Sequence, residues 1–220
     1  MNTGGKSILS SMLITALLLI CIWCLSYSTV YADNDHWSDA TNRDATWEDR
    51  GISTPEQLAQ FAYLVNSGNY QGKGRVWLEK DINIRGKEWA PIGNHEQNYY
   101  KGAFTGNGYT VSGMQITDFV KDYNEDTFYG LFGVISGTIK NLNIAGTIHC
   151  SEATRYCSIG SIAGQSNATV KNCSSSGGIQ ISATSLSASD TGGIVGANTG
   201  SIIGFRTEVT MTMDRGNSRP

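Results

Sequence analysis

Three histidines are the side chains of this sequence best suited to bind a metal or to transfer protons near neutral pH. His36, His95 and His149 lie in different segments, and none has a cysteine, a second histidine or an acid at metal-ligand spacing. We therefore interpret them as turn or surface residues and predict no metal site.

Acidic residues are the next candidates, because calcium binds clusters of carboxylates. Residues 122–126 read Asp-Tyr-Asn-Glu-Asp, but Thr127 and Gly133 stand where a calcium-binding loop needs glycine and glutamate. We interpret this stretch as a solvated insertion and predict no calcium and no other cofactor. Paired catalytic carboxylates are not indicated either, since the three segments that the repeats below define contain no acid, with Asp190 just outside them. These segments are 129–148, 159–176 and 191–206.

Serine and cysteine are the candidate nucleophiles. Ser161 directly follows Gly160 and Ser166 lies two residues after Gly164, but neither has the spacing of a nucleophile elbow, so we predict no catalytic residue. A disulfide between Cys150 and Cys157 would close a short loop and stabilise the fold by roughly 2.5 kcal/mol in the chain-entropy treatment. Whether these two cysteines are bonded stays open at this stage, and Cys173 is interpreted as a small buried hydrophobic residue.

The richest group of aromatic side chains lies between residues 99 and 129. A platform of such rings is one way to bind a sugar or a peptide. Packing of the same rings in the first turns of the fold is the alternative interpretation. The group comprises Tyr99, Tyr100, Tyr109, Tyr123, Phe128 and Tyr129, with Trp77 and Trp89 nearby.

An internal repeat defines the elements that must position these residues. The pattern GLFG at 130–133 recurs as SIAG at 161–164 and as GIVG at 193–196, and the closing glycines lie 31 and 32 residues apart. A β-branched residue follows each closing glycine by six positions. Self-similarity near this period is typical of stacked solenoid units. We predict an all-β fold, a right-handed parallel β-helix, rather than a β-sandwich with coincidental glycines.

Alignment of the copies on the closing glycine predicts columns of equivalent residues. Each copy then contains two short β-prone runs separated by a turn. An earlier, looser copy follows Phe104, and we match its apolar residues to the next copy at an offset of 28 residues; Val76 to Ile84 would form a first coil. The predicted columns include Leu131/Ile162/Ile194, Phe132/Ala163/Val195, Ile139/Val170/Ile202, Leu142/Cys173/Phe205, and, for the looser copy, Val111, Met114 and Ile116 over Ile139, Leu142 and Ile144.

A helix is predicted over residues 54–67, ahead of the first coil. Thr54 is a suitable N-cap, Pro55 suits the first helical position and Gln57 completes a capping box. Apolar residues at 58, 61, 62 and 65 form one face, and Gly68 is the expected left-handed cap. We predict that this helix covers the open edge of the first coil.

The N-terminal segment has the organisation of a secretory signal. Lys6 precedes a nearly uninterrupted apolar run over 12–25, and Val30-Tyr31-Ala32 matches a cleavage site. The net charge of −3 and the lack of a basic stripe make nucleic acid a poor partner. We predict a signal peptide at 1–32, an irregular lead-in at 33–50, the cap helix with the first coil at 51–93, and the repeat region at 94–220.

These motifs, taken in order, resemble the N-terminal part of bacterial surface proteins that carry GLUG repeats. The resemblance covers roughly residues 37–210 and includes the Trp89-Ala90-Pro91-Ile92-Gly93 turn and the run from Phe104 to Val111. It implies a right-handed parallel β-helix, export to the cell surface and frequent fusion to other modules. Gly204 departs from the asparagine found at 141 and 172, and no C-terminal cap is recognisable.

Two functions are consistent with these features. The first is a non-enzymatic, secreted or cell-surface module that binds host or envelope material, a glycan or a protein, as adhesins do, and that contacts membranes only during export. The second is a polysaccharide-processing lyase or hydrolase built on a β-helix. The acid-free repeat segments favour the first, and the uncapped last coil suggests self-association at the C-terminal end.

Export can be tested directly. Cleavage after Ala32 should leave a secreted protein that begins at Asp33, and mass spectrometry of the culture medium would measure its N-terminus. An intact N-terminus in a membrane fraction would contradict this prediction.

Overall fold

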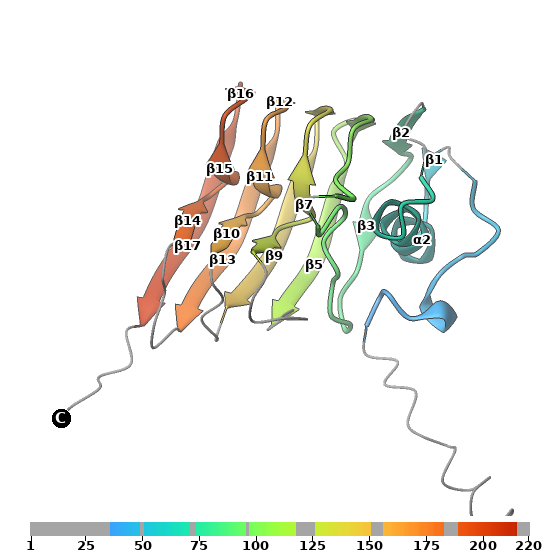
Figure 1. The fold of residues 1–220 in the computed structure, drawn as a ribbon, viewed down its shortest axis with the longest axis horizontal. Helices are drawn as coiled ribbons and strands as arrows, with labels where there is room; N and C mark the ends of the chain where they lie inside the picture. The colour runs from blue at the N-terminus through green and yellow to red at the C-terminus, as the bar shows by residue number, and fades with distance from the viewer. Residues whose placement is uncertain are drawn as a thin grey trace, which may run out of the picture. The chain divides into compact units, whose positions relative to one another are not determined.

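The chain folds into a solenoid of parallel strands. The computed structural model describes residues 36–48, 51–70, 74–95, 97–117, 126–150, 156–182 and 189–214. Parallel sheets stack as a β-solenoid of about four turns, with a single α-helix at its N-terminal end among these residues (Figure 1). The predicted parallel β-helix with an N-terminal capping helix is confirmed. The segment assigned to the signal peptide lies outside the described residues.

Four sheets form the sides of the solenoid, and each sheet takes one strand from successive turns. The first sheet has the order β1 (Gly51–Ile52), β2 (Arg75–Leu78), β4 (Ala103–Thr105), β8 (Thr138–Lys140), β12 (Thr169–Lys171) and β16 (Ser201–Ile203), and the second has the order β17 (Arg206–Asp214), β13 (Ser174–Ser182), β9 (Asn143–Cys150), β5 (Thr110–Thr117) and β3 (Ile82–Asn83). The third sheet has the order β15 (Val195–Asn198), β11 (Ala163–Ser166) and β7 (Phe132–Ile135), and the fourth has the order β14 (Ser189–Gly192), β10 (Cys157–Gly160) and β6 (Thr127–Tyr129).

One turn of the later solenoid, here called a coil, contains four strands, so the expectation of two β-prone runs per copy was wrong. The coil made of β10 to β13 shows why. Cys157–Gly160 and Ser174–Ser182 are rich in serine and glycine, which have weak β-propensity. They are extended because their backbone groups pair with equivalent strands in the coils before and after them.

The columns predicted for the three later coils are confirmed by the strand register. Ala163 pairs with Phe132 and Val195, and Val170 pairs with Ile139 and Ile202. The side chains of Leu131, Ile162 and Ile194 are all buried. The core is therefore a set of apolar columns that run along the solenoid axis.

The closing glycine of each repeat is required by a close approach of backbones. A Cβ atom added to Gly164 would lie 2.6 Å from the carbonyl oxygen of Ser158, and one added to Gly196 would lie 2.7 Å from the carbonyl oxygen of Gly164. Real side chains do not tolerate such contacts with backbone atoms. The motif that revealed the repeat therefore reports a packing constraint within each coil and between adjacent coils.

A left-handed residue turns the backbone at the corner before each of the long strands β5, β9, β13 and β17. Asn107, Asn141 and Asn172 have φ angles of 53°, 52° and 53°, and Gly204 has a φ of 62°. Asparagine and glycine are the residues that adopt this conformation most readily. Gly204, which stands where the two preceding coils have asparagine, thus keeps the backbone geometry of the asparagines at equivalent positions.

The register predicted for the looser early copy was wrong. Phe104 pairs with Ile139, Val111 with Ile144 and Ile116 with Ile148, so no constant offset of 28 residues exists. The turn after Thr105 is longer than the equivalent turn after Lys140, and the ladder between β5 and β9 is irregular between Ser112 and Met114. Both features add residues to this coil, and Gly113 at the irregularity has a φ of +73°. The first coil predicted over Val76 to Ile84 is present as β2 and β3.

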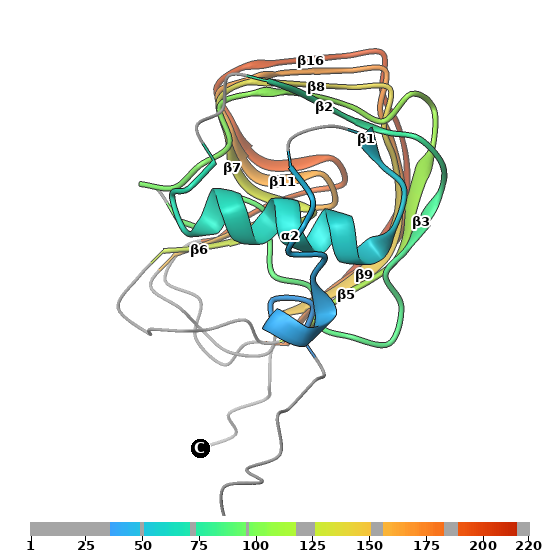
Figure 2. The same ribbon diagram turned by 90° about the vertical axis from the view of Figure 1, so that its right-hand side faces the viewer.

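Helix α2 (Pro55–Asn66) lies across the N-terminal end of the stack (Figure 2). The Thr54 hydroxyl accepts a hydrogen bond from the Gln57 amide at 3.2 Å, and the Gln57 side chain accepts one from the Ser53 amide at 2.8 Å. The expected capping box therefore forms, displaced by one residue. The predicted apolar face is buried, and Gly68 has a φ of 72°, as expected for a helix end.

The lead-in at 33–50 packs, in its described part, against helix α2 and the first coil. It contains a short 3-10 helix, η1 (Ala40–Asn42), between two buried tryptophans. The indole N–H of Trp37 donates to the carbonyl of Ile84 at 2.7 Å, and the ring of Trp47 packs edge-on against Phe61. Described residues of the lead-in thus form part of the folded unit.

The column assignment predicts that a substitution by aspartate lowers the stability of the fold much more at Ile162, which points inward, than at Lys171, which is exposed. Ile162→Asp would bury an unpaired charge and should cost more than about 3 kcal/mol of unfolding free energy. Lys171→Asp, at an exposed position of β12, should change stability by less than about 0.5 kcal/mol. Chemical denaturation would measure both, and equal losses would contradict the inward orientation of Ile162.

Candidate binding pocket beside the capping helix

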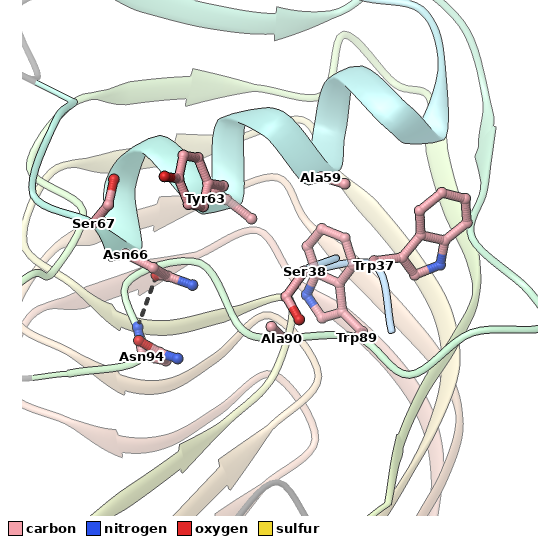
Figure 3. Close-up of a pocket in the computed structure, with 10 residues that line it drawn as sticks. Trp37, Ser38, Ala59, Tyr63, Asn66, Ser67, Trp89, Ala90 and Asn94 are labelled. Atoms are coloured by element: carbon pink, nitrogen blue, oxygen red, sulfur yellow. Dashed lines mark hydrogen bonds between the residues drawn. The ribbon is translucent and has the colours of Figure 1, made fainter. Parts of the chain in front are cut away.

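A pocket of about 350 Å³ lies beside α2. Figure 3 shows helix residues Ala59 and Tyr63 on one side of the pocket, and Trp89 and Asn94, from the segment after β3, on the other. The segment that carries Trp37 closes one end. The lining residues are Trp37, Ser38, Ala59, Ala62, Tyr63, Asn66, Ser67, Trp89, Ala90 and Asn94.

Asn66, the last residue of α2, fixes the distance between the two walls. Its side-chain oxygen accepts hydrogen bonds from the amides of Gly93 at 2.7 Å and of Asn94 at 3.3 Å. Its side-chain NH₂ group donates to the carbonyl of Pro91 at 3.0 Å. One side chain therefore satisfies three backbone groups of the 91–94 turn, which gives the pocket a preformed shape.

Aromatic rings supply most of the apolar wall. The indole N–H of Trp89 donates to the carbonyl of Leu131 at 3.1 Å, which anchors the buried ring to the turn between β6 and β7. Tyr63 is the exposed aromatic ring of the lining, with 41% of its surface accessible. The guanidinium carbon of Arg43 lies 3.6 Å from the centre of the Tyr63 ring and holds it by a cation–π contact.

The lining contains no ionisable group other than the tyrosine phenol. Its polar side chains are two amides, two serine hydroxyls and the phenol, placed among tryptophan and alanine side chains. Such a surface suits an uncharged ligand that offers both apolar faces and hydroxyl or amide groups. The volume of about 350 Å³ lies at the small end of the range usual for small-molecule sites.

The aromatic group predicted from the sequence mostly forms the core. Tyr100, Phe128, Tyr129 and Trp89 are buried, and the Tyr100 ring packs against Phe61 and Phe132 with centroids 5.3 and 5.6 Å away. Packing in the first coils is therefore the correct interpretation for these four. Trp77 and Tyr99 are half-buried, Tyr109 is exposed, and Tyr123 lies outside the described residues.

The three histidines lie on different elements. His36 pairs through its backbone with Glu88, the His95 ring accepts a hydrogen bond from the Gln97 amide, and His149 belongs to β9. Among the residues that the structure describes, no group of three or more His, Cys, Asp or Glu side chains is arranged to hold a metal ion. The absence of metals and cofactors stays a prediction.

One polar pair that contains an acidic residue bridges two coils near the start of β10 and β14. The Tyr156 hydroxyl donates a hydrogen bond to the Asp190 carboxylate of the next coil, and this bond raises the pKa of Tyr156. Both side chains are at the surface. The calcium-like stretch at 122–126 lies outside the described residues except for Asp126, which is exposed.

The cysteines lie inside the solenoid. The Sγ atoms of Cys150 and Cys157 are 3.8 Å apart at the junction of β9 and β10, where they form a thiol–thiol contact rather than a disulfide. This contact, together with burial, raises the pKa of Cys157. Cys173 is buried between Leu142 and Phe205 in its column, as predicted, and burial raises its pKa as well.

Four polar and aromatic residues of the pocket escaped the sequence analysis. Trp37 and Asn94 lie in irregular segments, where no periodicity marks them. Tyr63 is the one large aromatic residue outside the predicted apolar face of the helix, and no pattern marks Asn66 at the helix end. An exposed tyrosine on an otherwise well-patterned helix was the one signal that could have indicated a site.

Comparison with known proteins yields no relative: no protein-family model, curated protein or solved structure matches the chain. Over the described ranges, no helix has the length and apolarity needed to cross a bilayer.

Buried thiols should react slowly with alkylating reagents, the more so where the pKa is raised, as it is for Cys157 and Cys173. In reduced protein at pH 8, iodoacetamide should label Cys150, Cys157 and Cys173 far more slowly in the native state than after unfolding, where cysteine has a pKa near 8.5. Peptide mass mapping would measure each site. Rapid native labelling of Cys173 would contradict its placement in the core.

Proposed function

We propose that this chain is an exported, non-enzymatic binding module, secreted or held at the cell surface, that acts as adhesins do. The resemblance to GLUG-repeat surface proteins and the signal-like N-terminus support export. The parallel β-helix provides a rigid scaffold on which a binding surface can be displayed. A glycan of the host or of the cell envelope is the ligand class that the pocket suits best.

One observation carries the choice of a glycan. The pocket beside α2 combines aromatic walls with amide and hydroxyl groups and holds no carboxylate or cationic group. Sugar rings present apolar C–H faces to aromatic rings and hydroxyl groups to amides, so both halves of this lining find partners. An anionic ligand would need positive charge in the lining, and the two cations nearest its rings, Arg43 at Tyr63 and Lys87 at Trp37, are not lining residues.

Binding to a panel of uncharged glycans would test the proposal. Tyr63→Ala removes the exposed ring of the pocket and should weaken binding about tenfold, which corresponds to roughly 1.4 kcal/mol. Tyr109→Ala is the matched control, because Tyr109 is also exposed, at 36%, and does not line the pocket. Ligand binding should also shift the fluorescence of Trp37 and Trp89.

Two outcomes would contradict the proposal. Equal affinities for both tyrosine variants would exclude the pocket as the binding site, and no binding to any glycan would exclude the ligand class. The thermal stability of each variant should be measured in parallel, because loss of the Arg43–Tyr63 contact also loosens η1.

A polysaccharide-processing enzyme is the second candidate, and the Tyr156–Asp190 pair is the observation that favours it. A carboxylate hydrogen-bonded to a phenol on adjacent coils is a possible acid–base pair. Unsaturated products released from uronic-acid polymers by the wild type, and abolished by Asp190→Asn, would support this enzyme over the binding module.

A further inference from the structure

The last coil of the solenoid presents an unpaired edge. Strands β14, β15, β16 and β17 each stand at the end of their sheets, and each pairs with one neighbouring strand among the described residues. Strand β17 is the longest of them, and it contains alternating threonines and apolar residues without proline. Such edges are templates for pairing with another chain.

Apolar side chains that belong to core columns are exposed at this edge. Phe205 is 56% exposed, whereas Cys173 at the equivalent position of the preceding coil is 2% exposed. Met211 is 49% and its equivalent Ile179 is 1% exposed; Met213 is 53% and its equivalent Ile181 is 3% exposed. The terminal face is thus one half of an interface between coils, and its other half is missing from the described chain.

The direction of the free backbone groups in β17 can be assigned. The Arg206 amide donates to the carbonyl of Cys173 at 3.1 Å, so it points toward the preceding coil. Because backbone groups alternate along a strand, the amides of Thr207, Val209, Met211 and Met213 point toward the open edge. The register with β13 has no shift, so the alternation holds along the strand.

Another copy of the same edge is the partner that fits. Helix α2 covers the N-terminal end of the stack, so within the described chain the coil edge left open is the C-terminal one. A closed pair with two-fold symmetry brings identical surfaces together. Two β17 strands related by such an axis run antiparallel.

One register of this pair satisfies both backbone and side chains. With the axis at Thr210, Val209 faces Met211 of the partner subunit, and Thr207 faces Met213 of the partner subunit. All of these residues direct their amides to the open edge, so they form the hydrogen-bonded pairs of an antiparallel ladder. Their side chains point to the core side, so the exposed methionines become covered.

We propose that two copies of this chain associate through their last coils, with antiparallel β17 strands centred on Thr210. The association goes beyond the binding function, and it leaves the pockets beside α2 at the two far ends of the dimer. A surface that carries many copies of one glycan would then be bound bivalently, through one pocket at each end of the dimer.

A charge-reversal experiment at Thr210 tests the proposal. The exposed Thr210 side chain should lie opposite Thr210 of the partner subunit, so Thr210→Asp and Thr210→Lys each place like charges face to face. Each variant should raise the dimer dissociation constant at least about tenfold, as measured by sedimentation of the full chain. An equimolar mixture of the two variants should regain the dimer, because opposite charges then meet.

Thr147→Asp is the matched control. Thr147 is an exposed threonine in the same row of the same sheet, since both Thr147 and Thr210 pair with Gly178, and it lies away from the edge. This variant should dimerise like the wild type. Val209→Pro, which removes an amide from the open edge alone, should give monomers with an unchanged fold by circular dichroism. A monomeric wild type, or a mixture that fails to re-form dimers, would overturn the proposal.

Discussion

In-register stacking is the constraint on which the rest of this structure depends. Each residue lies above its equivalent in the preceding coil, so a position must keep the same backbone geometry and the same orientation in every turn. Most inward positions therefore stay apolar, as from Leu131 to Ile194, although Ser166 replaces Ile135 in one buried column. The corner stays left-handed from Asn107 to Gly204. Side-chain identity varies within these limits, as the column Phe132, Ala163 and Val195 shows.

The cap and the pocket are linked through the same core. Phe61 of α2 packs against Tyr100 and Phe104 of the coils, with ring centroids 5.3 and 6.0 Å away, so helix and solenoid share one apolar cluster. Asn66 then joins the end of the helix to the turn below it. The pocket lies between elements that are fixed on both sides, and a ligand meets a surface that needs little rearrangement to bind it.

The periodic parts of this fold could be predicted from the sequence, whereas the irregular parts could not. The closing glycines and the column through Ile162 were readable because steric and apolar requirements recur at a fixed spacing. The early coil was misaligned because the longer turn after Thr105 and the irregularity at Gly113 break that spacing. The pocket was missed because Trp37, Tyr63 and Asn94 come together only through tertiary contacts, which leave no local pattern. The solvated insertion without calcium at 122–126 and the signal peptide at 1–32 stay sequence-based predictions.

The long strands pass to the next coil through connections of unequal length, nine residues after β5 and six residues after β9 and after β13. The connections at 118–126, 151–156 and 183–188 all join the sheet of β5, β9 and β13 to the sheet of β6, β10 and β14. An insertion within β9 would reverse which side chains face inward from that point on, whereas one at these connections leaves the strand faces unchanged. Evolutionary drift in length should therefore collect along this one edge, where successive connections start about 4.8 Å apart and form a row of positions open to foreign sequence.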